Sequence, residues 1–107
     1  MKKASFKSLL ETKPIVKLIG AHDGFGARLG EKAGFDAIWA SGFEISSSYC
    51  VPDANILSMS EVLHSADIIN KATAIPVIAD CDSGFGDINN VIHMVKSFEN
   101  RHIAGCA

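Results

Sequence analysis

Residues 78–86 read Ile78-Ala79-Asp80-Cys81-Asp82-Ser83-Gly84-Phe85-Gly86, an apolar run that ends in two carboxylates and a glycine-rich turn. Because side chains two apart on a strand point to the same face, a strand that continues to Asp82 places both acids on one side, roughly 6–7 Å apart at the backbone. Carboxylates this close repel each other unless a cation or a shared proton lies between them. A hard cation such as Mg²⁺ prefers oxygen ligands and relieves this repulsion. The pattern therefore predicts a metal site at the carboxyl end of a buried strand.

The same residues also have a simpler interpretation. Asp-Ser-Gly is common in turns, because Asp hydrogen-bonds to nearby backbone and Gly tolerates positive φ. An Asp-x-Asp after a strand is therefore equally consistent with a polar strand exit that binds nothing. The rest of the chain has to decide between the two interpretations.

The composition favours one α/β domain with a well-covered sheet. The chain has 107 residues, of which 48% are hydrophobic. This share suits a parallel sheet, whose strands are buried on both faces. A formal net charge of −2 with ten basic residues does not indicate nucleic-acid binding. No apolar run approaches the about 20 residues of a membrane span, and the first residues lack the apolar core of a secretory signal.

Three cysteines, Cys50, Cys81 and Cys106, are widely spaced along the chain. Their number and spacing match neither a disulfide framework nor a zinc site. Cys81 is predicted to point away from the two flanking acids, toward covering helices, as a small buried hydrophobe. Reduced thiols and the lack of a secretory signal lead us to expect a cytoplasmic protein.

Strand and helix patterns alternate along the chain, which predicts βα units on a parallel sheet and thus the α/β class. Strands are predicted over residues 16–21, 35–40, 75–80 and 103–107. A short helix over Ser5–Glu11 comes first, and longer helices are predicted to begin after Asp23, Ser58 and Asp87. Ser58 and Glu61 have the spacing of a capping box. Residues 45–57 are predicted to form a long polar connection.

Polar and glycine residues gather where the predicted strands end, at 21–24, 41–43 and 80–84. In parallel α/β sheets, ligands bind beyond the carboxyl ends of the strands. The coincidence of the three segments supports a binding site more strongly than any one of them. Trp39, beside the second segment, is interpreted as core packing. Glu44 is interpreted as a polar loop residue, with a supporting contact to a site residue as the alternative.

Three segments in this order carry a resemblance to a known family: Trp39-Ala40-Ser41-Gly42-Phe43-Glu44, Pro52-Asp53-Ala54-Asn55 and Asp80-Cys81-Asp82-Ser83-Gly84-Phe85-Gly86. They resemble the phosphoenolpyruvate mutase and phosphonopyruvate hydrolase branch of the isocitrate lyase superfamily. Residues 20–24 and 33–38 match the same pattern, so the likeness runs from about Phe6 to Ala107. It implies that residues 1–107 are a single segment, about three and a half βα units from the N-terminal part of a (β/α)8 TIM barrel.

The resemblance also implies a reaction and a set of residue roles. The reaction is the Mg²⁺-dependent interconversion of phosphoenolpyruvate and phosphonopyruvate, an isomerase step that forms the carbon–phosphorus bond in phosphonate biosynthesis. Asp80 is implied to bind Mg²⁺ directly, and through it the substrate, while Asp82 holds the ion through water. Ser41, Gly42 and Phe43 are implied to bind the oxygens of a pyruvyl group. Asp53 is implied to lie near the transferring phosphoryl group, either as its acceptor or as an orienting residue.

The chain differs from that family mainly in its length, because such a barrel needs about 250 residues. We therefore expect an N-terminal portion of a longer enzyme, inactive by itself, whose exposed sheet edge favours self-association into a homo-oligomer. The alternatives are phosphonopyruvate hydrolase, another 2-oxoacid enzyme of the superfamily, or a non-catalytic half-barrel that binds a small anion or metal. Isocitrate-type lyases fit less well, because no cysteine lies in the context of their catalytic segment.

Overall fold

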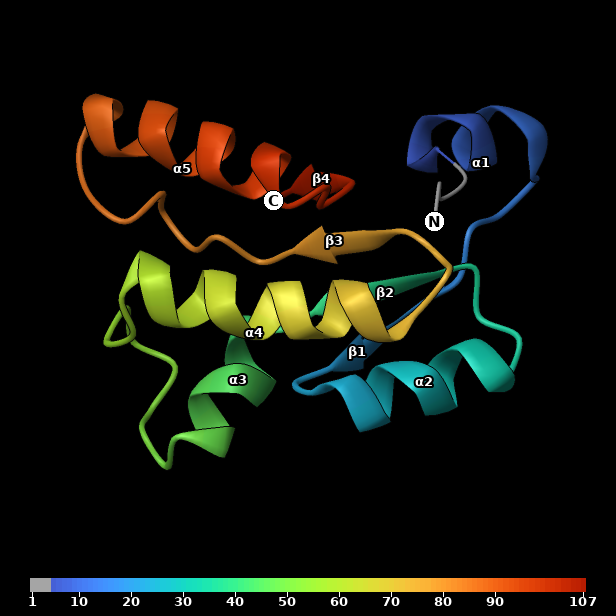
Figure 1. The fold of residues 1–107 in the computed structure, drawn as a ribbon, viewed down its shortest axis with the longest axis horizontal. Coiled ribbons are helices and arrows are strands. Elements are labelled where there is room, and N and C mark those ends of the chain that lie inside the picture. The colour runs from blue at the N-terminus through green and yellow to red at the C-terminus, as the bar shows by residue number, and fades with distance from the viewer. Residues whose placement is uncertain (1–4) are drawn as a thin grey trace.

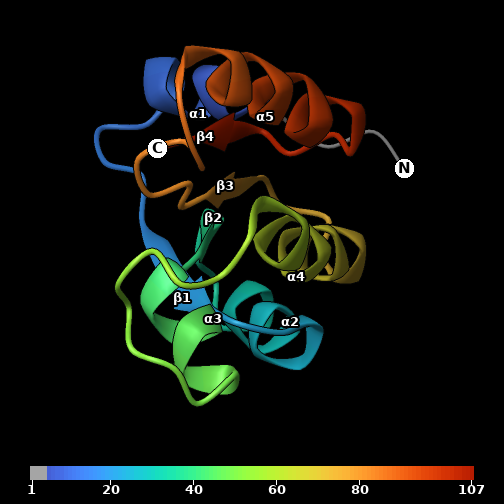
Figure 2. The ribbon, with the colours of Figure 1, turned by 90° about the vertical axis from the view of Figure 1, so that its left-hand side faces the viewer.

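The computed structural model describes residues 5–107. Its centre is a parallel sheet of four strands in the order β1-β2-β3-β4. Helices α2, α4 and α5 lie along one face of this sheet, as the end-on view in Figure 2 shows. The elements are α1 (Phe6–Thr12), β1 (Leu18–Ala21), α2 (Gly24–Lys32), β2 (Ala37–Ala40), α3 (Gly42–Ser48), α4 (Met59–Ala72), β3 (Val77–Ala79), α5 (Ile88–Asn100) and β4 (Gly105–Cys106), labelled in Figure 1. The predicted α/β class and parallel sheet are confirmed.

The predicted helix starts are confirmed by their caps. The side chain of Asp23 accepts a hydrogen bond from the Gly26 N–H at the start of α2. Ser58 and Glu61 form the predicted capping box of α4, and Asp87 caps α5. Each cap satisfies N–H groups that the first turn of a helix leaves without a partner.

The core lies between the sheet and the helices on its covered face. Alternate strand residues, Ile38 and Ala40 on β2 and Val77 and Ala79 on β3, are fully buried there. Phe98 of α5 is also fully buried in this cluster. Strand neighbours are in register, with Ile38 paired to Val77 and Ile78 to Gly105. Residues on the covered face therefore alternate with residues on the face that carries the candidate site.

Two elements differ from their predicted bounds. The third strand, predicted over residues 75–80, spans Val77–Ala79, and Asp82 has a φ of +47°, so the condition that the strand continues to Asp82 is not met. The carboxylate of Asp80 accepts the Asp82 N–H at 3.1 Å, which turns the chain. Residues 45–57 are not wholly a connection either, because α3 occupies its beginning. Ser41 caps this helix, and the buried Ile45 anchors it.

The turn leaves the prediction for Cys81 intact. Its side chain is 3% exposed and belongs to the core cluster, as expected for a small hydrophobe. Burial raises the pKa of the Cys81 thiol, with the neighbouring Cys106 adding to the effect. Within the described residues, no helix has the length and apolar character needed to cross a membrane.

Candidate functional site

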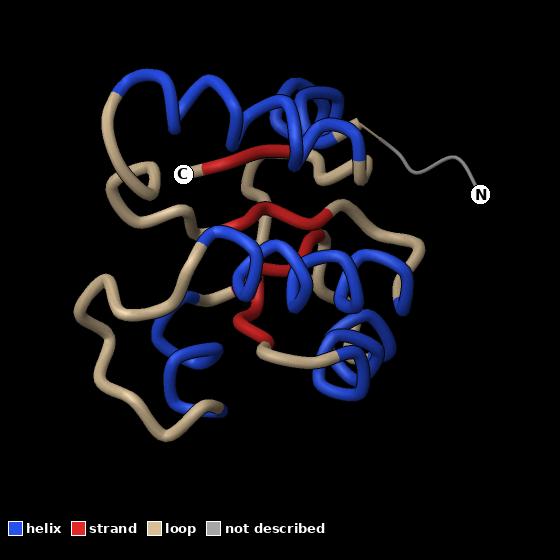
Figure 3. The backbone as a smooth tube through the Cα atoms, turned by 60° about the vertical axis from the view of Figure 1, so that its left-hand side comes forward, coloured by secondary structure: helices blue, strands red, loops and turns tan. Residues whose placement is uncertain are grey.

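The loops that follow β3 and α3 gather at one end of the molecule, together with the C-terminus (Figure 3). This is the carboxyl end of the parallel strands, where ligands bind in sheets of this kind. The N–H of Asp80 donates to the Ala40 carbonyl at 3.1 Å, so the backbone ladder reaches one residue past β3. Asp80 therefore keeps the alternation of the strand, and its half-buried side chain emerges opposite the helices.

Both carboxylate oxygens of Asp80 are held by backbone donors. Oδ2 accepts the N–H of Gly42 at 3.1 Å, and Oδ1 accepts the N–H of Asp82 at 3.1 Å. One donor comes from the first residue of α3 and the other from the loop after β3. Charge-assisted hydrogen bonds of this kind fix the orientation of a carboxylate.

Gly42 leaves the space that the two acids occupy. A Cβ atom on this residue would lie 2.7 Å from Oδ2 of Asp80 and 3.5 Å from Oδ1 of Asp82. A contact of 2.7 Å is shorter than any that a real side chain makes, so a larger residue would displace Asp80. Asp80 and Asp82 thus converge on Gly42, although they no longer share a strand.

Asp82 lies in a field of negative charge. Its pKa is raised, first because the loop partly withdraws the carboxylate from water, and then because Asp80 and Asp53 repel its charge. Asp53, on the loop between α3 and α4, is itself exposed. The structure thus brings the three acids of the predicted site into electrostatic range of one another. Such a group attracts a cation, since binding one removes the repulsion.

The other predicted residues begin α3. Ser41 is 7% exposed, and its hydroxyl oxygen accepts the Glu44 N–H at 3.2 Å. Phe43, two residues after Ser41, is 64% exposed. Of the three residues, Gly42 contacts Asp80, whereas Ser41 is buried at the cap of α3 and Phe43 is open to solvent.

Sequence reasoning missed the position of Glu44. It is not a loop residue: it lies in the first turn of α3, half-buried, and its carboxylate rests against the backbone of Gly20 in β1. A side chain on Gly20 would collide with that carboxylate. A glycine within a strand is a known sign of close approach by another group, and this was the available signal.

Strained backbone concentrates around the same loops. Positive φ at non-glycine residues occurs at Cys50 and Asn55 in the loop before α4, and at Asp82 and Phe85 in the loop before α5. His102, before β4, is the other example among residues 5–107. Such conformations carry a cost and cluster at functional sites. Four of these five positions in residues 5–107 thus lie in the two loops at the carboxyl end of the sheet.

The donor set fits Mg²⁺ better than a transition metal. Within residues 5–107, no three His, Cys, Asp or Glu side chains are placed to hold a metal ion together. Two carboxylates, Asp80 and Asp82, are what this segment offers. Mg²⁺ takes oxygen ligands and commonly keeps several waters, so it accepts such a sparse set.

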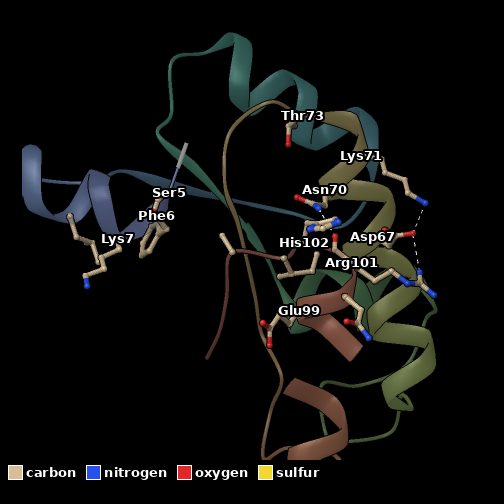
Figure 4. A pocket seen from close by; sticks show the side chains of 14 residues that line it. Ser5, Phe6, Lys7, Asp67, Asn70, Lys71, Thr73, Glu99, Arg101 and His102 are labelled. Atoms are coloured by element: carbon tan, nitrogen blue, oxygen red, sulfur yellow. Dashed lines mark hydrogen bonds and ion pairs between the residues drawn. The ribbon is translucent and has the colours of Figure 1, made fainter. Parts of the chain in front are cut away.

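A groove of about 1110 Å³ lies at the opposite, amino end of the strands. It is lined by α1, the end of α4 and the turn before β4. There the carboxylate of Asp67 accepts hydrogen bonds from Lys71 at 2.8 Å and from Arg101 at 3.1 Å (Figure 4). Asn70 donates to the Arg101 carbonyl at 2.9 Å. These contacts join α4 to the turn before β4. At the amino end of barrel strands, polar contacts of this kind serve stability.

Comparison with known proteins shows the family of the chain and agrees with its fold. The family model described as phosphoenolpyruvate phosphomutase matches residues 6–107. A phosphonopyruvate hydrolase of Variovorax sp. (strain Pal2) is 45% identical over 98 residues, which cover 92% of this chain and 34% of that protein. The crystal structure of phosphoenolpyruvate phosphomutase from Streptomyces platensis subsp. rosaceus superposes with a TM-score of 0.92 and 49% identity, over 94% of this chain and 35% of that one.

A third relative is a solved complex of phosphonopyruvate hydrolase with oxalate and Mg²⁺, with a TM-score of 0.90 and 43% identity over 94% of this chain and 35% of that one. The chain spans about a third of the length of the relatives it matches. The predicted fold, the first βα units of a (β/α)8 barrel, is thereby confirmed. The chain belongs to the phosphoenolpyruvate phosphomutase family of the isocitrate lyase superfamily.

Proposed function

We propose that this chain supplies the Mg²⁺-binding and pyruvyl-binding part of an enzyme that interconverts phosphoenolpyruvate and phosphonopyruvate. The supporting observation is the pair of acids at the end of β3: Asp80 is oriented by two backbone donors, and Asp82 lies beside it across Gly42. In this proposal residues 1–107 form one N-terminal segment of the barrel. The complete protein works in the cytoplasm as a homo-oligomer on a small 2-oxoacid.

Asp80 and Asp82 would hold the metal ion, Asp80 directly and Asp82 through water. When bound there, Mg²⁺ supplies Lewis-acid stabilisation of the negative charge that develops on a pyruvate enolate. The pKa of Asp82 is raised first by burial and then by the charges of Asp80 and Asp53, and this second contribution supports the assignment, because a cation would relieve the repulsion. The two backbone hydrogen bonds hold the Asp80 carboxylate in a fixed orientation.

Ser41, Gly42 and Phe43 would contact the pyruvyl oxygens. Ser41 Oγ already accepts a hydrogen bond from Glu44, which leaves its O–H free to donate to a substrate oxygen. Gly42 contributes in another way, because its N–H donates to Asp80 and its missing side chain gives the substrate access. The N–H of Phe43, in the first turn of α3, is a second donor for the same group.

Asp53 would act on the phosphoryl group. It lies on the loop between α3 and α4, close enough for its charge to repel that of Asp82. A loose phosphoryl transition state requires positioning and charge stabilisation more than covalent assistance. An aspartate in this position either accepts the phosphoryl group or orients it, and both roles place it opposite the enolate.

Hydrolysis of phosphonopyruvate is the second candidate, favoured by the 45% identity to a phosphonopyruvate hydrolase. Phosphorus NMR of the full-length protein with phosphonopyruvate and Mg²⁺ separates the two. Formation of phosphoenolpyruvate supports the mutase, whereas pyruvate with inorganic phosphate supports the hydrolase. If neither product forms although oxalate, a mimic of the pyruvate enolate, binds, a non-catalytic module that binds a small anion becomes the better account.

A further inference from the structure

The side chain of Glu44 connects the short helix α3 to strand β1, on the face of the sheet that carries the acids. Gly20 lies in β1 between Ile19 and Ala21, and both of these contact the core on the helix-covered face. A side chain on Gly20 would therefore point to the opposite face. Oε2 of Glu44 lies where that side chain would begin, and the Cβ of Ser41 is 3.8 Å from the same position. Glu44 thus fills the space that Gly20 leaves empty.

Two neighbouring residues fix how α3 lies on the sheet. The helix spans only seven residues, Gly42–Ser48, and three of them are serines, so its own helix propensity gives it little stability. Ile45 is fully buried in the core cluster, while Glu44 rests on β1. Consecutive helix residues point about 100° apart. Ile45 and Glu44 therefore hold α3 from two different directions, and loss of either contact allows its first turn to rotate about the other.

The orientation of α3 matters because its start carries groups of the site. The Gly42 N–H donates to Asp80 at 3.1 Å, and Ser41 Oγ accepts the Glu44 N–H at 3.2 Å. The backbone of Ser41 is fixed separately, since its N–H donates to the Ala21 carbonyl at 3.2 Å. A rotation of the first turn about this fixed point moves the Gly42 N–H and the Ser41 hydroxyl relative to Asp80.

We propose that Glu44 is a positioning residue, which fixes the first turn of α3 by resting on Gly20. The groups that it places are the Ser41 hydroxyl and the Gly42 N–H. This inference rests on the proposed function, in which those two residues belong to the pyruvyl-binding part of the site. Glu44 acts through its neighbours and touches neither the metal ion nor the reacting atoms. Its side chain works by its size and place, so an amide of the same size serves as well as the carboxylate.

The contact can be removed from the strand or from the helix, which allows a double-mutant cycle. Gly20→Ala pushes the Glu44 carboxylate aside without a change in α3, and Glu44→Ala removes it without a change in β1. Calorimetry of the full-length protein with Mg²⁺ is expected to show oxalate binding about 10-fold weaker in each variant. Because both changes remove one contact, the double variant is expected to bind no more weakly than either single variant. Losses that multiply to about 100-fold in the double variant would overturn the contact.

Two further variants separate the position of the side chain from its charge. Glu44→Gln keeps the size and is expected to bind oxalate like wild type, and Ser47→Ala, an exposed change on the same helix, is the control. Tighter binding by Glu44→Gln and Glu44→Ala alike would mean that the charge of Glu44 repels the ligand, which overturns the positioning role. A loss in Glu44→Gln as large as in Glu44→Ala, or wild-type affinity in Glu44→Ala, overturns it as well.

The Tm values of wild type, the two single variants and the double variant test the contact without any ligand. Alanine is favoured over glycine within a strand, and without Glu44 a methyl group on Gly20 meets only the Ser41 Cβ, at an ordinary 3.8 Å. Gly20→Ala is therefore expected to raise the Tm of the Glu44→Ala variant and not that of wild type. Equal changes in the two backgrounds overturn the contact. If wild type fails to bind oxalate, the proposed function fails, while this comparison still decides whether Glu44 rests on Gly20.

Discussion

At the residue scale, the geometry of the site depends on the missing side chain of Gly42 as much as on the acids. Gly42 donates its N–H to Asp80 and leaves room for both carboxylates at the same time. Only a residue without a Cβ does both, because the space above its Cα is already filled. The prediction that Asp80 faces the site could be made from the alternation of the strand. The close approach to Gly42 could not, since it joins residues far apart in the chain.

Gly42→Ala tests this dependence. The added methyl group would lie 2.7 Å from Oδ2 of Asp80, so the carboxylate has to move away from the position that backbone donors give it. We expect Mg²⁺-dependent oxalate binding to weaken about 10- to 100-fold, while the circular dichroism spectrum stays that of the wild type. Ser47→Ala, an exposed change on the same helix, serves as the control. Unchanged affinity in Gly42→Ala would show that Asp80 does not need this approach.

The positions of Glu44 and Asp82 in the structure differ from those expected from the sequence. The two acids would share a strand face only if the strand continued to Asp82, but the hydrogen bond from the Asp82 N–H to Asp80 turns the chain into a left-handed conformation. Glu44 was placed in a loop, but it lies on α3 against Gly20. The two causes differ: the first is the local Asp turn of the simpler interpretation, and the second is a contact between α3 and β1 that forms only in the folded chain.

At the scale of elements, helix starts followed from the sequence because capping chemistry is local. Ser58 with Glu61, and Asp87, lie directly before the helices they begin. The short helix α3 escaped prediction because its sequence is rich in serine, a weak helix former, and it spans only Gly42–Ser48. Its stability comes from the Ser41 cap and from burial of Ile45, and the burial appears only in the folded chain.

Asp36 links the segment before β1 to the start of β2. Its carboxylate accepts hydrogen bonds from the Lys13 ammonium at 2.7 Å and from the Lys17 N–H at 2.9 Å, and these donors lower its pKa from the ordinary value of 3.8. The contribution to stability is therefore complete above pH 3.8 and is lost as the pH falls through the lower native pKa.

Asp36→Asn should accordingly lower the Tm at pH 7, and the deficit relative to wild type should shrink as the pH falls below 3.8. Thermal melts at a series of pH values measure this difference. Glu11→Gln, at an exposed acid on α1, controls for the loss of one surface charge. A deficit that stays constant down to the lowest pH would mean that the charge of Asp36 is not what stabilises this junction.

At the scale of the whole molecule, the two ends of the sheet carry different groups of residues. The carboxyl end carries the acids and the strained loops, and the amino end carries the cluster of Asp67, Lys71 and Arg101. Exposed apolar side chains lie on α2 and α5, beside the two outer strands: Phe25, Leu29, Ile88, Ile92 and Val95. In a barrel these are the faces against which further βα units pack.

Asp67→Asn tests the division between the two ends. Asp67 is 7% exposed, but both of its cationic partners reach solvent, so the loss of its charge should cost about 1 kcal/mol of unfolding free energy. Denaturant titration measures that loss, with Glu99→Gln, an exposed acid of the same groove, as the control. Oxalate affinity should not change. A parallel loss of affinity would show that the two ends are coupled.

The most direct test of the account is calorimetry of oxalate binding to the full-length protein, with and without Mg²⁺, in wild type and Asp80→Asn. The account predicts binding by wild type only when Mg²⁺ is present, and a loss of about 100-fold in Asp80→Asn, which keeps the size of the side chain and removes its charge. Asp87→Asn, at the cap of α5, should bind like wild type. Tight, Mg²⁺-dependent binding by Asp80→Asn would contradict the central claim.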